Sequence, residues 1–236
     1  TIFQGTDYAE PGVHTKDWVL LDYQSKQLDS YLQHIRVAVD LAANDDESLV
    51  LFSGGATRES AGPRSEAMSY WLYADAQHWF GHNGTSEQDS HIAVKDRVHT
   101  EEFARDSFQN LLFSVCRFRQ LTLSYPARIT VVSLPFKENR FRDLHRKALR
   151  YPVDRFSFVG VGDSTPEAVT GEQRNSVVPF TSDPYGCHGS LEAKRRGRNP
   201  WNVATPYPKG CEELAGLFKY CGDGFYQGPL PWDASG

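Results

Sequence analysis

Residues 49–55 read Leu-Val-Leu-Phe-Ser-Gly-Gly, a short apolar run that ends in a serine and two glycines. A continuous apolar run of this length, bounded by turn residues, is typical of a strand covered on both faces of a parallel sheet. The segment after Pro63 then carries apolar residues that suggest a helix, at Ala67, Trp71, Ala74 and Trp79. Strand, glycine turn and helix in this order indicate a βα unit.

The same alternation continues on both sides of this unit. Further strands are expected at residues 1–3, 92–94, 129–132 and 156–159. Further helices are expected at 28–42, from about Thr100 to Phe118, and at 139–149. We therefore predict a three-layer, Rossmann-like α/β fold with a mostly parallel sheet.

The last part of the chain has a different composition. From residue 163 onward proline and glycine become frequent, and aromatic residues are too many for a disordered tail. We expect residues 1–162 to form the Rossmann-like core. Residues 163–236 should form an irregular extension packed on that core within the same domain, with one short helix at 211–220.

Composition and charge exclude several classes of protein. The 236 residues are 39% hydrophobic with a net charge of −5, which fits a globular chain and disfavours general nucleic-acid binding. No apolar run is long enough to cross a membrane. The four cysteines form no Cys-x-x-Cys pair. We therefore expect no metal site, a buried free thiol at Cys116, and a reduced, cytoplasmic protein.

The run from Lys194 to Arg198 is the one basic cluster in the sequence. A solvated loop is the simplest interpretation, and nuclear targeting or phosphate contact are functional alternatives. A third is that residues 183–187 and Arg195 fold back over the pocket.

Polar residues follow the expected strands at their carboxyl ends, where ligands bind in open α/β sheets. The amides of Gly54 and Gly55, after Ser53, are placed to approach an anion near a helix N-terminus. The alternative is a plain tight turn in which Ser65 caps the next helix. Glu66 is expected in the first turn of that helix.

Two further loops carry charged residues. Glu102 and Asn110 are expected on the helix after the strand at 92–94. Glu102 shares one stripe of that helix with Asp106 and Gln109, and a solvated face is the alternative for this stripe. Lys137 and Arg140 follow Ser133 at a helix start, where cations oppose the helix dipole. A bound phosphate or carboxylate, or the nearby acids, would offset that cost. A structural ion pair is the alternative.

These motifs form a recognisable series: Ser53-Gly54-Gly55, Ser65-Glu66-Ala67, the segment from Glu102 to Asn110, and the segment from Ser133 to Arg140. The series resembles the YdcF/SanA/ElyC family, a domain of unknown function, and the chain is similar to its fungal-type members. The resemblance covers about residues 1–162. It implies a Rossmann-like sheet with a polar pocket over the strand ends, and S-adenosylmethionine as a cofactor known from the bacterial branch.

The chain departs from the family pattern at three positions. Lys137 stands where the family has histidine, Ser107 where it has threonine, and Gln109 where it has glutamate. A free lysine has a pKa of about 10.4, so Lys137 is expected to hold an anion electrostatically. It would act as a base only where burial lowers that pKa.

We therefore expect a small-molecule enzyme that acts on an anionic or nucleotide-like ligand. The catalytic candidates are Glu66, Glu102 and Lys137, and the ligand-binding candidates are Gln4, Gly5, Ser53, Gly54, Gly55, Asn110, Ser133 and Arg140. The alternative is a non-catalytic protein of the same fold that binds a ligand or serves as a scaffold. We expect no membrane partner, and the oligomeric state is open.

Overall fold

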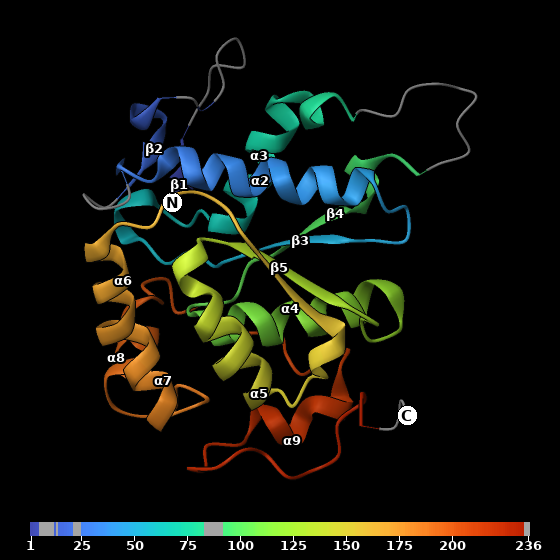
Figure 1. Cartoon of the computed structure of the whole chain (residues 1–236), viewed down its shortest axis with the longest axis vertical. Coiled ribbons are helices and arrows are strands. Elements are labelled where there is room, and N and C mark those ends of the chain that lie inside the picture. The colour runs from blue at the N-terminus through green and yellow to red at the C-terminus, as the bar shows by residue number, and fades with distance from the viewer. Residues whose placement is uncertain (5–11, 13, 21–24, 83–91, 234–236) are drawn as a thin grey trace.

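The computed structural model describes residues 1–4, 12, 14–20, 25–82 and 92–233. They form a mixed α/β structure in which short parallel strand pairs alternate with helices (Figure 1). Strands β3, β4 and β5 lie between α2 and α3 on one side and α4 and α5 on the other, whereas β1 and β2 lie at one end of α2 (Figure 1). The coarse α/β prediction is confirmed.

Two strand pairs are parallel and one is antiparallel. β3 (Val50–Ser53) pairs with β4 (Val98–Glu101), and β5 (Ile129–Ser133) pairs with β6 (Phe156–Gly160). β1 (Ile2–Phe3) pairs antiparallel with β2 (Trp18–Val19). Within the described residues the strands form these three separate pairs, so the continuous sheet expected from the sequence is not seen there.

The strand predicted at 92–94 is wrong. Val94–Arg97 forms a 3-10 turn, and the strand starts only at Val98. Arg97 is 7% exposed, and its guanidinium donates to the carbonyls of Ala42, Asp45 and Ser48 at the end of α2. Satisfying these helix-end carbonyls holds the turn in place and shifts the strand toward the C-terminus.

The helices of the first part lie close to their predicted positions. Their bounds are α2 (Leu28–Ala43), α3 (Glu66–Ala76), α4 (Ser107–Thr122), a π-helical segment at Arg140–His145 and α5 (Arg146–Ala148). The predicted start of α4 near Thr100 is wrong, because Thr100 belongs to β4. Asp106 is the N-cap instead, and its carboxylate accepts a hydrogen bond of 2.8 Å from the Gln109 amide.

The extension after residue 162 is more helical than predicted. Its helices are α6 (Pro166–Glu172), a π-helical segment at Gln173–Val177, α7 (Val178–Ser182), α8 (Gly189–Gly197) and α9 (Ala215–Phe218). Pro166 stands in the first turn of α6, where proline is tolerated because its missing N–H has no intrahelical partner. Helical dihedrals continue from α6 through Gln173–Val177 into α7, so Pro179 lies inside one continuous helical stretch, just after the π-helical segment. The prolines that indicated irregular structure are therefore accommodated in a helix here.

Two disulfides join the extension to itself and to the core. Cys116 of α4 is bonded to Cys211, and Cys187 is bonded to Cys221. The predicted free thiol at Cys116 is therefore wrong. Cys116 and Cys211 are both fully buried in the core cluster that α4 and α5 share with the extension. Residues of the extension thus pack against α4 and α5 in one buried cluster. Among the described residues no helix is both long and apolar enough to cross a membrane.

Candidate functional site

The ends of β3 and β4 are joined by a buried carboxylate that the sequence did not single out. Ser53 Oγ donates to Glu101 Oε2 at 2.7 Å and lies 3.4 Å from Asn110 Oδ1. Glu101 is 1% exposed, and its Oε1 accepts from the Phe103 amide at 2.8 Å. Burial raises the pKa of Glu101, although these hydrogen bonds oppose the rise. Ser53 and Asn110 therefore lie together beside a structural carboxylate.

The two glycines after β3 bring backbone segments together. The Gly54 amide donates to the Glu101 carbonyl at 2.9 Å, and the Gly55 amide donates to the Ala104 carbonyl at 2.8 Å. Gly54 has φ +151°, and a Cβ there would lie 3.0 Å from the Glu66 Cβ. The expected role of these amides in holding an anion is therefore wrong, because both N–H groups are already used.

Glu66 opens α3 with its carboxylate at the carboxyl end of β3. Thr57 Oγ1 donates to Glu66 Oε1 at 3.1 Å, and the Thr1 nitrogen lies 3.5 Å from the same oxygen. Burial alone would raise the pKa of Glu66. The Thr1 amino group, the Thr57 hydrogen bond and the charges of Arg58 and Arg198 outweigh burial and hold that pKa below its usual value. Glu66 is therefore ionised at neutral pH.

Glu102 is tied to the loop in front of α3. Ser65 Oγ donates to Glu102 Oε2 at 2.6 Å, and Thr100 Oγ1 donates to Oε1 at 3.0 Å. The same Ser65 oxygen caps α3 by accepting from the Met68 amide at 2.9 Å. Glu102 thus lies beside the helix that carries Glu66, and both of its carboxylate oxygens accept hydrogen bonds.

Arg140 does not face the acids that the sequence suggested. Its Nε lies 2.8 Å from Glu172 Oε1, and the side chains are 10% and 7% exposed. Glu172 ends α6 in the C-terminal extension. The expectation that Glu66 and Glu102 balance Arg140 is therefore wrong, and the structural ion pair that was the alternative is present.

Lys137 remains available at the end of β5. It is half-buried in the 3-10 turn Pro135–Lys137. Its ammonium group has neither an ion pair nor a hydrogen bond among the described residues. Burial and the charges of Arg140 and Arg198 lower the pKa of Lys137 to about 8, although Glu172 and Glu66 oppose the shift. Lys137 was expected to act as a base only if burial lowered its pKa, and burial does lower it here.

The charge of Lys137 also affects the pKa of a histidine, His34. His34 of α2 donates from Nε2 to the Val161 carbonyl, just beyond β6, at 2.8 Å. Burial lowers the pKa of His34 to about 4; the Val161 hydrogen bond opposes the shift and the charge of Lys137 adds to it. His34 is therefore neutral. The charges that act on Lys137 belong to Glu66 of α3, to Arg140 after β5, and to Glu172 and Arg198 of the extension.

The basic cluster lies on α8 and at its end, and two of its arginines face the core. Arg195 Nε lies 2.6 Å from Asp106 Oδ2, at the N-cap of α4. Arg198 donates to the Arg105 carbonyl at 2.9 Å. Of the interpretations of this cluster, the structure favours the one in which Arg195 folds back over the core. Arg198, which the sequence predicted only as part of the basic cluster, lowers the pKa of both Glu66 and Lys137 through its charge.

Two of the predicted ligand-binding residues have no hydrogen bond to the other candidate residues in the described part of the chain. Ser133 ends β5, and its carbonyl accepts from the Val161 amide at 2.9 Å. Gln4 is exposed, and its amide donates to the Asp17 carbonyl at 2.7 Å, away from the other candidates. Gly5 lies outside the described residues.

A buried serine–histidine contact resembles a catalytic dyad but has the wrong environment. Ser107 Oγ lies 2.7 Å from His145 Nε2. Burial, together with Arg140 and Arg195, lowers the pKa of His145 far below its usual value. His145 Nδ1 is buried without a hydrogen-bond partner, so no carboxylate would stabilise an imidazolium. We assign this contact a structural role.

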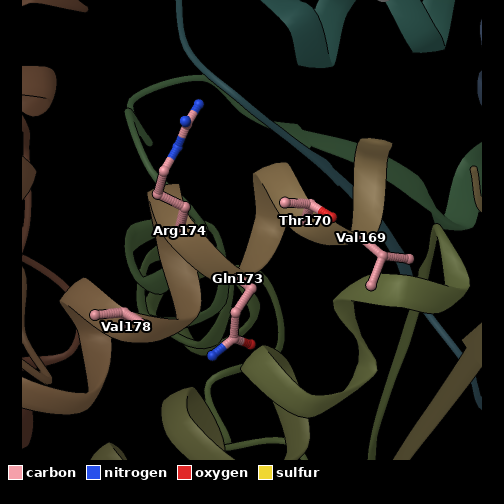
Figure 2. A pocket seen from close by; sticks show the side chains of 5 residues that line it. All are labelled: Val169, Thr170, Gln173, Arg174 and Val178. Carbon is pink, nitrogen blue, oxygen red and sulfur yellow. The ribbon is translucent and has the colours of Figure 1, made fainter. Parts of the chain in front are cut away.

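Two hollows open on the described surface. One of about 360 Å³ is lined by residues of 57–60, next to Glu66, together with Val19 and Leu20. The larger, of about 560 Å³, lies over α6 and α7, and Figure 2 shows its side chains pointing in different directions. Since ligand sites need converging polar groups, the smaller hollow beside Glu66 fits a site better. No cluster of three or more metal-ligating side chains is found in the described ranges.

Comparison with known proteins adds a distant relative. The chain is 28% identical over 239 residues to the uncharacterized protein YOR238W of Saccharomyces cerevisiae, covering 83% of this chain and 78% of the yeast protein. No protein-family model matches the chain, and no solved structure matches it. The yeast protein is described only as uncharacterized, so the relationship assigns no activity.

Proposed function

We propose that the protein is an enzyme that acts on a small anionic molecule bound over the carboxyl ends of β3 and β5. Lys137 and Arg198 would hold the anionic group, and Glu66 would act as a base. The observation that carries this proposal is the half-buried Lys137 ammonium, which lacks a partner in the described structure while the charges of Glu66 and Arg198 act on it.

The balance of charges supports an anionic ligand. Arg140 is neutralised by Glu172, and Arg195 by Asp106. Within the part of the chain that the structure describes, Lys137 and Arg198 have no such partner of their own. Glu66 is the acid whose charge acts on both of them. A cluster with surplus positive charge in a partly buried place attracts a carboxylate or phosphate.

Glu66 is suited to accept a proton. Its lowered pKa keeps it ionised at neutral pH, so it serves as a base better than as an acid. Glu102 is the second candidate, and its two hydroxyl donors favour a role in orienting the loop that carries Glu66.

We also propose a specific fold type and a class of ligand. The βα order and the motif series support a three-layer, Rossmann-like arrangement of the YdcF/SanA/ElyC kind. The arginines favour a nucleotide-like or other anionic ligand over S-adenosylmethionine, whose sulfonium is positive. We propose neither nucleic acid nor membrane as a partner.

Thermal shift measurements test this proposal with inorganic phosphate, adenosine monophosphate and S-adenosylmethionine as probes. A ligand at a hundred times its Kd adds about 2.7 kcal/mol, or roughly 5 °C in Tm for a chain of this size. We expect an anionic probe to stabilise the wild type and to lose this effect in Lys137→Met. Lys147→Met is the matched control, because Lys147 is exposed and paired with Asp143. Equal shifts in both variants would exclude Lys137 from the site.

A non-catalytic binding or scaffold protein is the competing candidate. It is favoured by the structural roles of the glycine amides, Glu101 and His145, which leave few groups for chemistry. Recovery of a stabilising ligand unchanged after long incubation would support this candidate and exclude the enzyme.

The disulfides bear on the cellular compartment. Disulfides persist in oxidising compartments and are rare in the cytosol. Because all four cysteines are paired, we propose an oxidising compartment in preference to the cytoplasm that the sequence suggested. Alkylation of the unreduced protein, read by mass spectrometry, tests this: free thiols in protein isolated from its own cells would support the cytoplasm.

A further inference from the structure

We propose that Lys137 forms an imine with a small carbonyl compound that also carries an anionic group, such as an aldehyde acid or an α-keto acid. This inference rests on the proposed function, because the same cationic cluster would hold the anionic group. It goes further in giving Lys137 a covalent role.

Lys137 differs from every other lysine of the chain in its surroundings. It is half-buried, whereas the other lysines are exposed. Lys95 and Lys147 lie within 3.6 Å and 3.5 Å of an aspartate, and Lys194 donates to a backbone carbonyl. The Lys137 nitrogen has no such partner among the described residues, so no contact has to be broken before it reacts.

The neighbouring charges favour the neutral amine that the reaction requires. A lysine attacks a carbonyl only after losing its proton, and burial beside other cations is how proteins achieve this. Arg140 and Arg198 supply the cations, from the helix after β5 and from the end of α8. With a pKa of about 8, about a tenth of Lys137 is neutral at pH 7.

The chemistry needs nothing beyond the groups described. The neutral Lys137 amine forms a C=N bond to the carbonyl carbon while the C=O bond breaks, and the oxygen leaves as water that carries both protons of the amine. Glu66, which is ionised and therefore able to accept a proton, relays these protons from nitrogen to oxygen. Arg198 keeps the anionic group of the ligand in place. No electrons are gained or lost overall.

Reductive trapping tests the proposal. The protein is incubated with glyoxylate and sodium cyanoborohydride at pH 7, and the modified lysines are identified by peptide mass mapping. We expect Lys137 to be labelled roughly tenfold or more faster than the exposed Lys147, because burial lowers the pKa of Lys137 and the cationic cluster would hold the carboxylate of glyoxylate beside it. Inorganic phosphate should slow the labelling of Lys137 and leave Lys147 unchanged.

Two controls separate the inference from the proposed function. Propanal has an aldehyde and no anionic group, so it should still label Lys137 faster than Lys147, but by a clearly smaller factor than glyoxylate does. Lys137→Arg should bind inorganic phosphate and form no adduct at this position. If Lys137 reacts no faster than Lys147 while phosphate still binds, the imine is excluded and the proposed function stands. If neither labelling nor phosphate binding is seen, both are excluded. Equal preference for Lys137 with propanal would exclude the anionic substrate class.

Discussion

The buried ion pair between Arg140 and Glu172 predicts how strongly the C-terminal extension stabilises the core. The two side chains are 10% and 7% exposed, and the charged atoms lie 2.8 Å apart. Glu172→Gln keeps the size of the side chain and removes its charge. The Arg140 guanidinium is then left buried without a counter-ion, which costs roughly 3–5 kcal/mol.

The expected effect is large enough for standard calorimetry. In a chain of this size each kcal/mol changes Tm by roughly 2 °C, so Glu172→Gln should lower Tm by roughly 6–10 °C. Glu192→Gln is the control, because its pair with Arg196 joins side chains that are 43% and 74% exposed. Exposed pairs contribute about 0–1 kcal/mol, so this variant should lose at most about 2 °C.

A paired replacement shows whether charge is the cause. Arg140→Met combined with Glu172→Met removes both charges and keeps apolar volume, so it should recover most of the lost stability. A small loss in Glu172→Gln, equal to that in Glu192→Gln, would refute the buried pair. A double variant as unstable as Glu172→Gln would show that packing, and not an uncompensated charge, explains the loss.

Three further outcomes are expected. Replacing Cys116 and Cys211 by serine frees a loop of 95 residues and should cost about 4.7 kcal/mol in urea unfolding; a loss below about 1 kcal/mol would contradict the bond. Lys137→Met should be more stable than the wild type at pH 7, because the unfolded chain binds the Lys137 proton more tightly than the folded one. This gap should close as pH rises from about 8 toward 10.5, and a gap independent of pH in thermal melts would exclude the lowered pKa. Ser107→Ala should cost about 1–2 kcal/mol in urea unfolding and leave the trapping of Lys137 unchanged, since Ser107 has a structural role; loss of trapping in a folded variant would contradict that role.

Much of the fold follows from local patterns. The run at 49–52 predicts β3 because a short, fully apolar segment suits a strand buried on both faces. β4 was missed because Val98, His99, Thr100 and Glu101 are mostly polar, and their pairing with β3 is a long-range property. The helices of the extension were missed because proline at a helix start and proline in a loop look alike in a single sequence.

The candidate site was predictable in position and less so in its contacts. Glu66 and Lys137 follow parallel strands, so the carboxyl-end rule finds them. The partner of Arg140 could not be found this way, since Glu172 comes from the extension. Glu101 and Glu102 are adjacent, and only the strand register decides which of them is buried, because neighbouring strand residues face opposite sides. Cysteine pairing likewise depends on the folded arrangement and not on spacing.

Calorimetric titration with inorganic phosphate tests most directly whether Lys137 and Glu66 share one anion site. Lys137→Met should weaken binding by about tenfold or more, because a charged hydrogen-bond donor is lost. Glu66→Gln should strengthen binding several-fold, because it removes a repelling carboxylate and keeps an oxygen for the Thr57 hydroxyl. Opposite effects from two residues on distant loops are the result that the site predicts. Unchanged phosphate affinity in both folded variants would contradict it.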